Sequence, residues 1–268
     1  MGKGICGEEE IPFHSNNSQW VCIQVKAGVY REKLTISANK PYIMIKGEGK
    51  RRTKVVWDDH ASVAQSPTLM VLADNFIAKC ISFTNSYNYP WNNGNPRVPA
   101  VAAMIAGDKC SFYRCGFFGL QDTLWDFQGR HYFKLCTIEG VVDFIFGTGQ
   151  SIYERCVISV IGEALDPNSP GFITAQGRTN ENDPNGFVFK DCNVIGQGLT
   201  YLGRPWRDYA RGFSMEDSGS LGPIISPSSN GNIIQGVRGT LSTTAVWARL
   251  TELPIEYYDI FRAPSTDG

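Results

Sequence analysis

The stretch SFYRCGFFGLQDTLWDFQGRHYFKLCTIEGVVDFIFG, residues 111–147, contains the same pattern twice. An apolar-rich segment ends in a cysteine, a glycine follows, and the next such cysteine comes about one solenoid coil later. The steps between successive cysteines of this kind are 35, 21, 20 and 36 residues, and the cysteines are Cys80, Cys115, Cys136, Cys156 and Cys192. The two short steps suit one coil of a solenoid, and the long steps suit a coil that carries an inserted loop.

The repeating unit is a short β-rich run with turn residues around it, and few stretches keep a helical period. The pattern therefore predicts an all-β fold, a right-handed parallel β-helix, in which each strand lies about 4.8 Å from its counterpart one coil earlier. The turn-rich segments NSYNYPWNNGNPRVP (85–99) and DPNSPG (166–171) coincide with the long steps and are expected to be the inserted loops.

The composition excludes several classes of function. The chain has 268 residues with a net charge of −1, so its charge gives no reason to expect nucleic acid as a partner. No apolar run approaches the roughly 20 residues of a membrane-spanning helix, and MGKGICGEEE (1–10) has no apolar core of a signal peptide. Eight cysteines without a CxxC pair do not indicate a zinc site, and we expect no metal and no cofactor.

The stacking distance of a β-helix also falls within the range that a disulfide tolerates. Neighbouring cysteines of the repeat, above all Cys136 and Cys156, are therefore close enough to form one. The alternative is a column of free thiols, since cysteine is often simply a small core residue. The spacing leaves both alternatives open.

Two aspartates fall at the same place in successive repeats. Asp122 lies seven residues after Cys115, and Asp143 lies seven residues after Cys136. In register, the two carboxylates would stack on adjacent coils, share a proton and have separated pKa values, so that one can donate a proton while the other acts as nucleophile or base. The apolar neighbours of Asp143 in GVVDFIFG would strengthen this effect. The structural alternative is an aspartate that bonds to the backbone of its own turn.

Further residues are candidates for the same site. Gln121 directly precedes Asp122 and could donate a hydrogen bond to a developing oxyanion. In YLGRPWRDY, Arg204 offers a planar fork for a carboxylate and Trp206 a flat apolar face for a sugar ring. Glu163 keeps the register of the acids, but its segment reads as a strand running out into a loop, so we discount it.

The remaining candidate groups are interpreted as structural. The sequence WDDH (57–60) is the only dense group of acids and histidine, and we interpret it as a solvated turn rather than a metal site. His14 and His131 have no partner that the sequence reveals, and we interpret both as structural.

Taken together, five stretches resemble the plant pectin methylesterase (pectinesterase) family. They cover roughly residues 20 to 211 and are VKAGVYREK (25–33), CSFYRCGFFGLQDTLWD (110–126), GVVDFIFGTG (140–149), ITAQGR (173–178) and YLGRPWRDYAR (201–211). The resemblance implies a right-handed parallel β-helix that removes methyl esters from homogalacturonan (pectin) in the plant cell wall, without a metal. It also implies a secreted monomer and a proteinaceous pectinesterase inhibitor as a further partner.

The resemblance also implies roles for individual residues. Asp143 corresponds to the nucleophile, and Asp122 to the general acid that later acts as base. Gln121 corresponds to a donor of the oxyanion hole, and Arg204 and Trp206 to substrate-binding residues. Arg204 is expected to hold either Asp143 or a neighbouring uronate in place. The family disulfide corresponds to Cys136 and Cys156.

Three departures from the family pattern stand out. Pro99, in VPAVAAM (98–104), occupies the place of a family glutamine that also serves the oxyanion hole, and proline lacks a donor there. Residues 1–20 form an atypical start, residues 21–212 the β-helix, and residues 213–268 a divergent segment that reads as loop. The second substrate-facing tryptophan of the family is missing from that segment, and Trp247 does not replace it.

Two rival functions remain from the sequence. The chain could be an inactive pectin-binding β-helix derived from a pectinesterase, which binds pectin without releasing methanol. It could also be another polysaccharide enzyme on the same fold, such as a polygalacturonase or a pectate lyase, since a fold alone does not fix the chemistry.

Overall fold

The computed structural model describes residues 16–165 and 169–210. The predicted segment 213–268 and most of the predicted segment 1–20 lie outside these residues, as do His14 and Trp247. Within the described part, the only helical element is one 3₁₀ turn, η1 (Gly162–Ala164), and all other regular structure is β-strand. No helix in this part is long and apolar enough to span a membrane.

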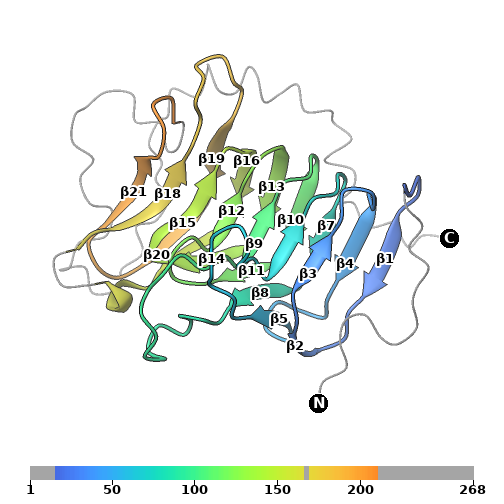
Figure 1. The fold of residues 1–268 in the computed structure, drawn as a ribbon, viewed down its shortest axis with the longest axis horizontal. Coiled ribbons are helices and arrows are strands. Elements are labelled where there is room, and N and C mark those ends of the chain that lie inside the picture. The colour runs from blue at the N-terminus through green and yellow to red at the C-terminus, as the bar shows by residue number, and fades with distance from the viewer. Residues whose placement is uncertain (1–15, 166–168, 211–268) are drawn as a thin grey trace. The chain divides into compact units, whose positions relative to one another are not determined.

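The strands form three parallel sheets of seven strands each (Figure 1). Sheet A contains β1 (Val21–Gln24), β4 (Ile43–Lys46), β7 (Ile77–Lys79), β10 (Cys110–Tyr113), β13 (Arg130–Lys134), β16 (Gln150–Glu154) and β19 (Gly186–Lys190). Sheet B contains β2 (Gly28–Arg31), β5 (Thr53–Trp57), β8 (Ser82–Asn85), β11 (Gly116–Phe118), β14 (Thr137–Gly140), β17 (Val157–Val160) and β20 (Asn193–Gly196). Sheet C contains β3 (Leu34–Ile36), β6 (Leu69–Val71), β9 (Ala103–Ile105), β12 (Leu124–Asp126), β15 (Val142–Gly147), β18 (Gly171–Gln176) and β21 (Thr200–Pro205).

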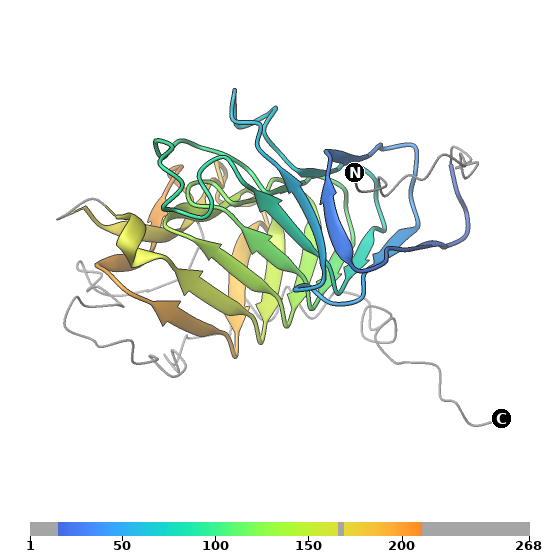
Figure 2. The same ribbon diagram turned by 90° about the horizontal axis from the view of Figure 1, so that it is seen from below.

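In each sheet every strand pairs with the strand three places later in the chain, so one coil contributes one strand to each sheet. Figure 2 shows the coils following one another in chain order, from blue at β1 to orange at β21. The fold is the right-handed parallel β-helix predicted from the sequence, with the hand that parallel crossovers almost always adopt. The predicted long coils are also present, since long connections join β8 to β9 and β17 to β18.

The cysteine repeat marks the corner where the chain turns from sheet A to sheet B. The residue before the corner has a positive φ in five coils, which are Cys80 (55°), Arg114 (53°), Leu135 (56°), Arg155 (53°) and Asp191 (53°). The next residue points into the core, and there Cys115, Cys136 and Cys156 are fully buried. Repeated backbone geometry at one corner is what holds the coils in register.

One member of the predicted repeat was assigned wrongly. Because Gly116 pairs with Ser82, Cys115 stacks on Ile81 and not on Cys80. Cys80 itself occupies the corner position with positive φ, and it is half-buried. The register thus differs by one residue in that coil, and a buried isoleucine takes the cysteine's place in the column.

Aromatic rings form a second column inside the coils. Phe112, Phe133, Tyr153 and Phe189 occupy equivalent positions of β10, β13, β16 and β19. Their ring centroids are 4.9, 4.6 and 4.7 Å apart, and the planes lie within 10° of parallel. Parallel in-register pairing repeats the side chain as well as the strand, so these flat rings stack directly on one another.

Cys136 and Cys156 stack on adjacent coils, as Thr137 pairs with Val157 directly after them. In the structure both are free thiols. Burial raises the pKa of each thiol, which keeps it protonated and unreactive. The disulfide that the family resemblance implies stays a prediction.

A buried polar cluster connects sheets A and C. Asp126 accepts hydrogen bonds from Tyr153 Oη at 2.6 Å and from His131 Nδ1 at 2.5 Å. His131 Nε2 lies 2.8 Å from the carbonyl oxygen of Gly107, and the His131 and Asp126 side chains are fully buried. A Cβ on Gly149 would lie 2.1 Å from Asp126 Oδ1, so only glycine fits beside this carboxylate. His131 therefore has a structural role, with a partner five residues earlier in the chain.

Replacing Asp126 with alanine is expected to lower the free energy of unfolding by about 3–5 kcal/mol, because it leaves a buried imidazole and a buried hydroxyl without their acceptor. Urea unfolding followed by circular dichroism measures the change. Asp108→Ala is the matched control, since Asp108 pairs with Arg130 where both side chains are about one-third exposed. That exposed pair is expected to contribute only about 1 kcal/mol or less. Equal losses in the two variants would contradict the prediction.

Candidate functional site

The two predicted acids lie on adjacent coils, where sheet C begins. Gln121 forms a parallel bridge with Val142, so Asp122 and Asp143 follow in the same register. The Asp122 amide donates to the Val142 carbonyl oxygen at 3.2 Å. Both aspartates have a positive φ, 61° for Asp122 and 49° for Asp143. Aspartate tolerates this backbone region better than most residues, and such conformations cluster at functional sites.

Arg204 connects β21 to Asp143 across the intervening strand β18. Its Nε donates to Asp143 Oδ1 at 2.8 Å, and its Nη2 donates to Asp143 Oδ2. The guanidinium carbon lies 4.8 Å from the centroid of the Phe172 ring on β18, which supports it from below. The Asp143 side chain is 12% exposed and that of Arg204 is 48% exposed, so solvent screens the attraction. The fork therefore acts mainly by fixing the orientation of the carboxylate.

The second acid has the opposite electrostatic environment. Burial, the largest effect, and the negative charge of Asp143 together raise the pKa of Asp122 to about 7, and Arg204 opposes both effects. At neutral pH Asp122 is thus a carboxyl group that can both give and take a proton. The structure brings together Asp122, Asp143 and Arg204, three of the residues singled out in the sequence.

Because of its raised pKa, Asp122 is expected to reduce stability above neutral pH. Between about pH 4 and pH 7 the carboxyl is ionised in the unfolded chain and protonated in the folded one, so rising pH favours unfolding. Asp122→Asn should remove this penalty and raise the free energy of unfolding at pH 8 by up to about 4 kcal/mol. Thermal unfolding at pH 4 and pH 8 checks the prediction. An equal shift at both pH values would contradict it.

Gln121 lies in the middle of a short column at the same edge of sheet C. It bridges Pro99 on one side and Val142 on the other, and its carbonyl oxygen accepts from the amide of Ala100 at 3.1 Å. Pro99 therefore lies one coil before Gln121. Gln121 is half-buried.

Sequence reasoning missed two aromatic residues beside the acids. Trp125 and Phe146 pair in register on β12 and β15 in a second hydrophobic cluster outside the main core, with ring centroids 5.4 Å apart; Trp125 is half-buried and Phe146 is buried. Trp206 meets Phe146 edge to face at 6.1 Å. A Cβ on Gly177 would lie 2.6 Å from the Trp206 ring, so glycine leaves room for the indole. The three rings form an aromatic stripe along the outer face of sheet C.

The spacing could have revealed this stripe. Trp125 lies three residues after Asp122, and Phe146 lies three residues after Asp143. The register that stacks the acids also stacks these rings. Trp206, which the sequence did single out, extends the stripe by its place after β21.

The acids of WDDH (57–60) do not join this site. Asp58 pairs with Arg31 at 2.5 Å and Asp59 with Lys33 at 2.7 Å. The hydrogen bond from Lys33 holds the pKa of Asp59 below its usual value. Across residues 16–165 and 169–210, no three His, Cys, Asp or Glu side chains are grouped in a way that could hold a metal ion.

The chain is similar to known proteins over most of its length. The pectinesterase family model matches residues 9–231, a range that extends beyond Arg211, where we expected the resemblance to end. Probable pectinesterase 29 of Arabidopsis thaliana is 62% identical over 199 residues, which are 73% of this chain and 59% of that protein. This chain thus spans about three-fifths of the length of that curated relative.

Solved structures agree with the sequence match. A pectin methylesterase from carrot superposes with a TM-score of 0.69 at 30% identity, over 75% of this chain and 65% of the other. A pectin methylesterase solved in complex with a hexasaccharide has a TM-score of 0.65 at 28% identity, over 81% of this chain and 68% of the other. With the family model matching well over half of its residues, the chain belongs to the pectinesterase family.

Proposed function

We propose that this chain is a carboxylic ester hydrolase that removes methyl esters from homogalacturonan, yielding pectate and methanol. The observation that carries the proposal is the unequal pair of acids. Asp143 is held by both ends of a guanidinium fork, whereas burial and the charge of Asp143 keep Asp122 protonated up to about pH 7. One acid is thus placed to attack and the other to donate a proton.

The proposed reaction has two steps. A carboxylate oxygen of Asp143 attacks the ester carbonyl carbon, and the Gln121 amide donates to the oxygen that becomes negative. Asp122 gives its proton to the departing methoxide, which leaves as methanol. Ionised Asp122 then takes a proton from water as the water attacks the acyl-enzyme, which restores the Asp143 carboxylate and leaves a free uronate.

Arg204 and the aromatic stripe complete the proposed site. Arg204 holds both oxygens of Asp143, while each oxygen keeps a second lone pair for attack. In the stripe, exposed Trp206 and half-buried Trp125 offer flat apolar faces on which sugar rings of a pectin chain stack, and buried Phe146 packs against both. Pro99 supplies no donor, so the proposed oxyanion stabilisation depends on Gln121.

The partners and location follow from the family. We propose pectin as the substrate and partner, in line with the hexasaccharide bound to one structural neighbour. We also propose action in the plant cell wall, in line with the plant origin of the relatives. An inhibitor protein as partner and a monomeric state stay predictions.

Methanol release from highly methylated pectin tests the proposal. Equal amounts of methanol and of newly titratable acid are expected, with no new reducing ends and no unsaturated product. Pectin binding without methanol would instead favour the inactive binding protein. New reducing ends would indicate a polygalacturonase, and unsaturated product a lyase; either result would overturn the esterase.

A further inference from the structure

The long connection between β8 and β9 is fastened to sheet B. Its Tyr89 donates from Oη to Glu139 Oε1 at 2.6 Å, and the Tyr89 ring stacks on Phe118 with centroids 5.9 Å apart. Glu139 also accepts from Ser159 Oγ at 2.8 Å. This connection, residues 86–102, is therefore held against the two following coils rather than projecting freely from them.

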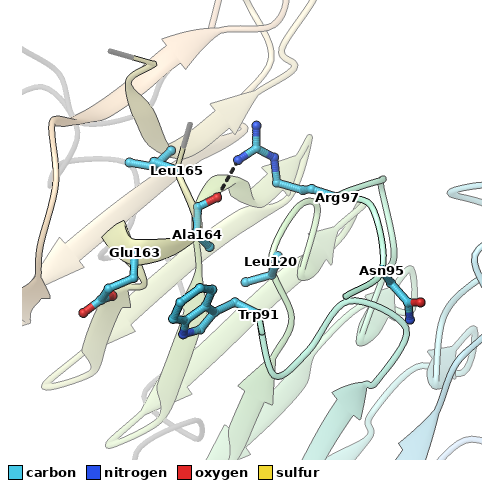
Figure 3. A pocket seen from close by; sticks show the side chains of 7 residues that line it. All are labelled: Trp91, Asn95, Arg97, Leu120, Glu163, Ala164 and Leu165. Atoms are coloured by element: carbon cyan, nitrogen blue, oxygen red, sulfur yellow. Dashed lines mark hydrogen bonds between the residues drawn. The ribbon is translucent and has the colours of Figure 1, made fainter. Parts of the chain in front are cut away.

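The same connection reaches the second long connection, between β17 and β18. Arg97 Nη1 donates to the carbonyl oxygen of Ala164 in η1 at 2.9 Å (Figure 3). Between the two long connections, the connections from β11 to β12 and from β14 to β15 are short. A pocket therefore lies between the two long connections. This pocket has a volume of about 390 Å³, within the range of about 300–1,000 Å³ usual for ligand sites. Its lining includes Trp91, Arg97, Leu120, Glu163, Ala164 and Leu165.

One residue of the pocket lining, Leu120, belongs to the turn that carries Gln121 and Asp122. Leu120 immediately precedes Gln121 and Asp122 in the chain. Its carbonyl oxygen accepts from the Val141 amide at 2.7 Å and from the Val142 amide at 3.3 Å, the two residues before Asp143. The turn that contributes Leu120 to the pocket therefore carries Asp122, and its backbone is hydrogen-bonded to the residues just before Asp143. The aromatic stripe begins on the other side of the acids, three residues further along each strand.

The chemistry of the lining suits an uncharged sugar unit. Trp91 is 44% exposed, and Figure 3 shows its ring beside Leu120 and Ala164. Leu165 adds a further apolar surface. Arg97 and Glu163 contribute one positive and one negative charge, so the charges of the lining cancel. Burying an ionised carboxylate without a net counter-charge is costly, whereas a methyl ester is neutral and partly apolar.

We propose that this pocket is an accessory subsite that binds a methyl-esterified galacturonosyl unit of the same pectin chain whose ester lies at Asp143. Trp91 is the stacking face, and the hydrogen bond from Arg97 to Ala164 keeps the two long connections together. The inference rests on the proposed function, since it takes pectin as the ligand. The subsite favours attack within esterified stretches of pectin, because a neighbouring esterified unit strengthens binding.

Calorimetric binding to the Asp143→Asn variant tests the subsite without turnover. The ligands are a fully methyl-esterified oligogalacturonide hexamer and the same hexamer after saponification. Adding Trp91→Ala is expected to weaken binding of the esterified hexamer by about tenfold, the effect of losing one stacking contact. Binding of the saponified hexamer should change much less. Trp20→Ala is the matched control, since Trp20 is 43% exposed before β1, in a coil far from the acids, and should leave both affinities unchanged.

The outcomes separate this inference from the proposed activity. Unchanged affinity for the esterified hexamer in Trp91→Ala would overturn the subsite, as would an equal loss for the saponified hexamer. Tighter binding of the saponified hexamer, lost in Trp91→Ala, would overturn the preference for the ester. Methanol release by the unsubstituted chain is measured separately, so a tenfold binding loss in Trp91→Ala supports the subsite whatever the result for the esterase.

Discussion

Replacing Asp143 with asparagine is expected to lower the rate of methanol release by about 10⁴- to 10⁶-fold, the range seen when the nucleophile of a hydrolase is removed. Asparagine has nearly the same shape but no negative charge, so it cannot form the acyl-enzyme. Its amide also presents an N–H₂ group to one arm of the Arg204 fork, which in the native protein meets two acceptor oxygens. Methanol release from methylated pectin by purified variant and unsubstituted chain gives the ratio.

The matched control is Asp191→Asn. Asp191 has a positive φ of 53°, close to the 49° of Asp143, but it lies at the corner between sheets A and B. The Asp191→Asn variant therefore places an asparagine at a similar positive φ away from the site. Its rate of methanol release should stay within about twofold of that of the unsubstituted chain. If Asp143→Asn keeps more than about a hundredth of the activity, Asp143 is not the nucleophile.

Replacing Asp122 with asparagine is expected to lower kcat by about 10²- to 10⁴-fold, the usual contribution of a positioned general acid or base. The variant keeps the carbonyl but can neither protonate methoxide nor activate water. The loss is smaller than for Asp143 because the nucleophile and the Gln121 donor remain. Single-turnover measurements separate formation of the acyl-enzyme from its hydrolysis, and both steps should be slow in this variant.

The pH profile gives a second, independent reading of Asp122. Formation of the acyl-enzyme requires its protonated form, so kcat/KM of the unsubstituted chain should fall as pH rises through about 7. Hydrolysis of the acyl-enzyme requires the ionised form and should accelerate over the same range. The descending limb of kcat/KM should disappear in Asp122→Asn. A kcat/KM that continues to rise well above pH 7 in the unsubstituted chain would contradict this assignment.

The cysteine spacing predicted the fold because a parallel β-helix maps sequence repeats directly onto spatial neighbours. Coils of 20 and 21 residues place Cys115, Cys136 and Cys156 in one column, and the prediction of stacked coils followed. The same reasoning failed at Cys80, which occupies the left-handed corner one residue before the column. Sequence alone does not show which residue of a turn adopts a positive φ, so the register there was wrong by one.

The same limit explains what the sequence left open around the acids. The stacking of Asp122 and Asp143 was visible because both lie seven residues after a column cysteine. Arg204 lies 61 residues after Asp143, and an inserted loop separates them. Its bidentate contact with that carboxylate depends on how the intervening coil brings β21 alongside β18. The partners Asp126 and Tyr153 depend likewise on which side chains the coil turns inward.

The sequence by itself determined the number of residues in a coil, the stacking of the two aspartates and the family. These follow from periodic spacing, which parallel pairing transfers unchanged into three dimensions. Only the tertiary structure decided that Arg204 binds Asp143, that burial and the charge of Asp143 raise the pKa of Asp122 to about 7, and that two long connections meet at a pocket next to the turn of Asp122. These three features depend on groups that are far apart in the chain. No local sequence pattern encodes the distances between such groups.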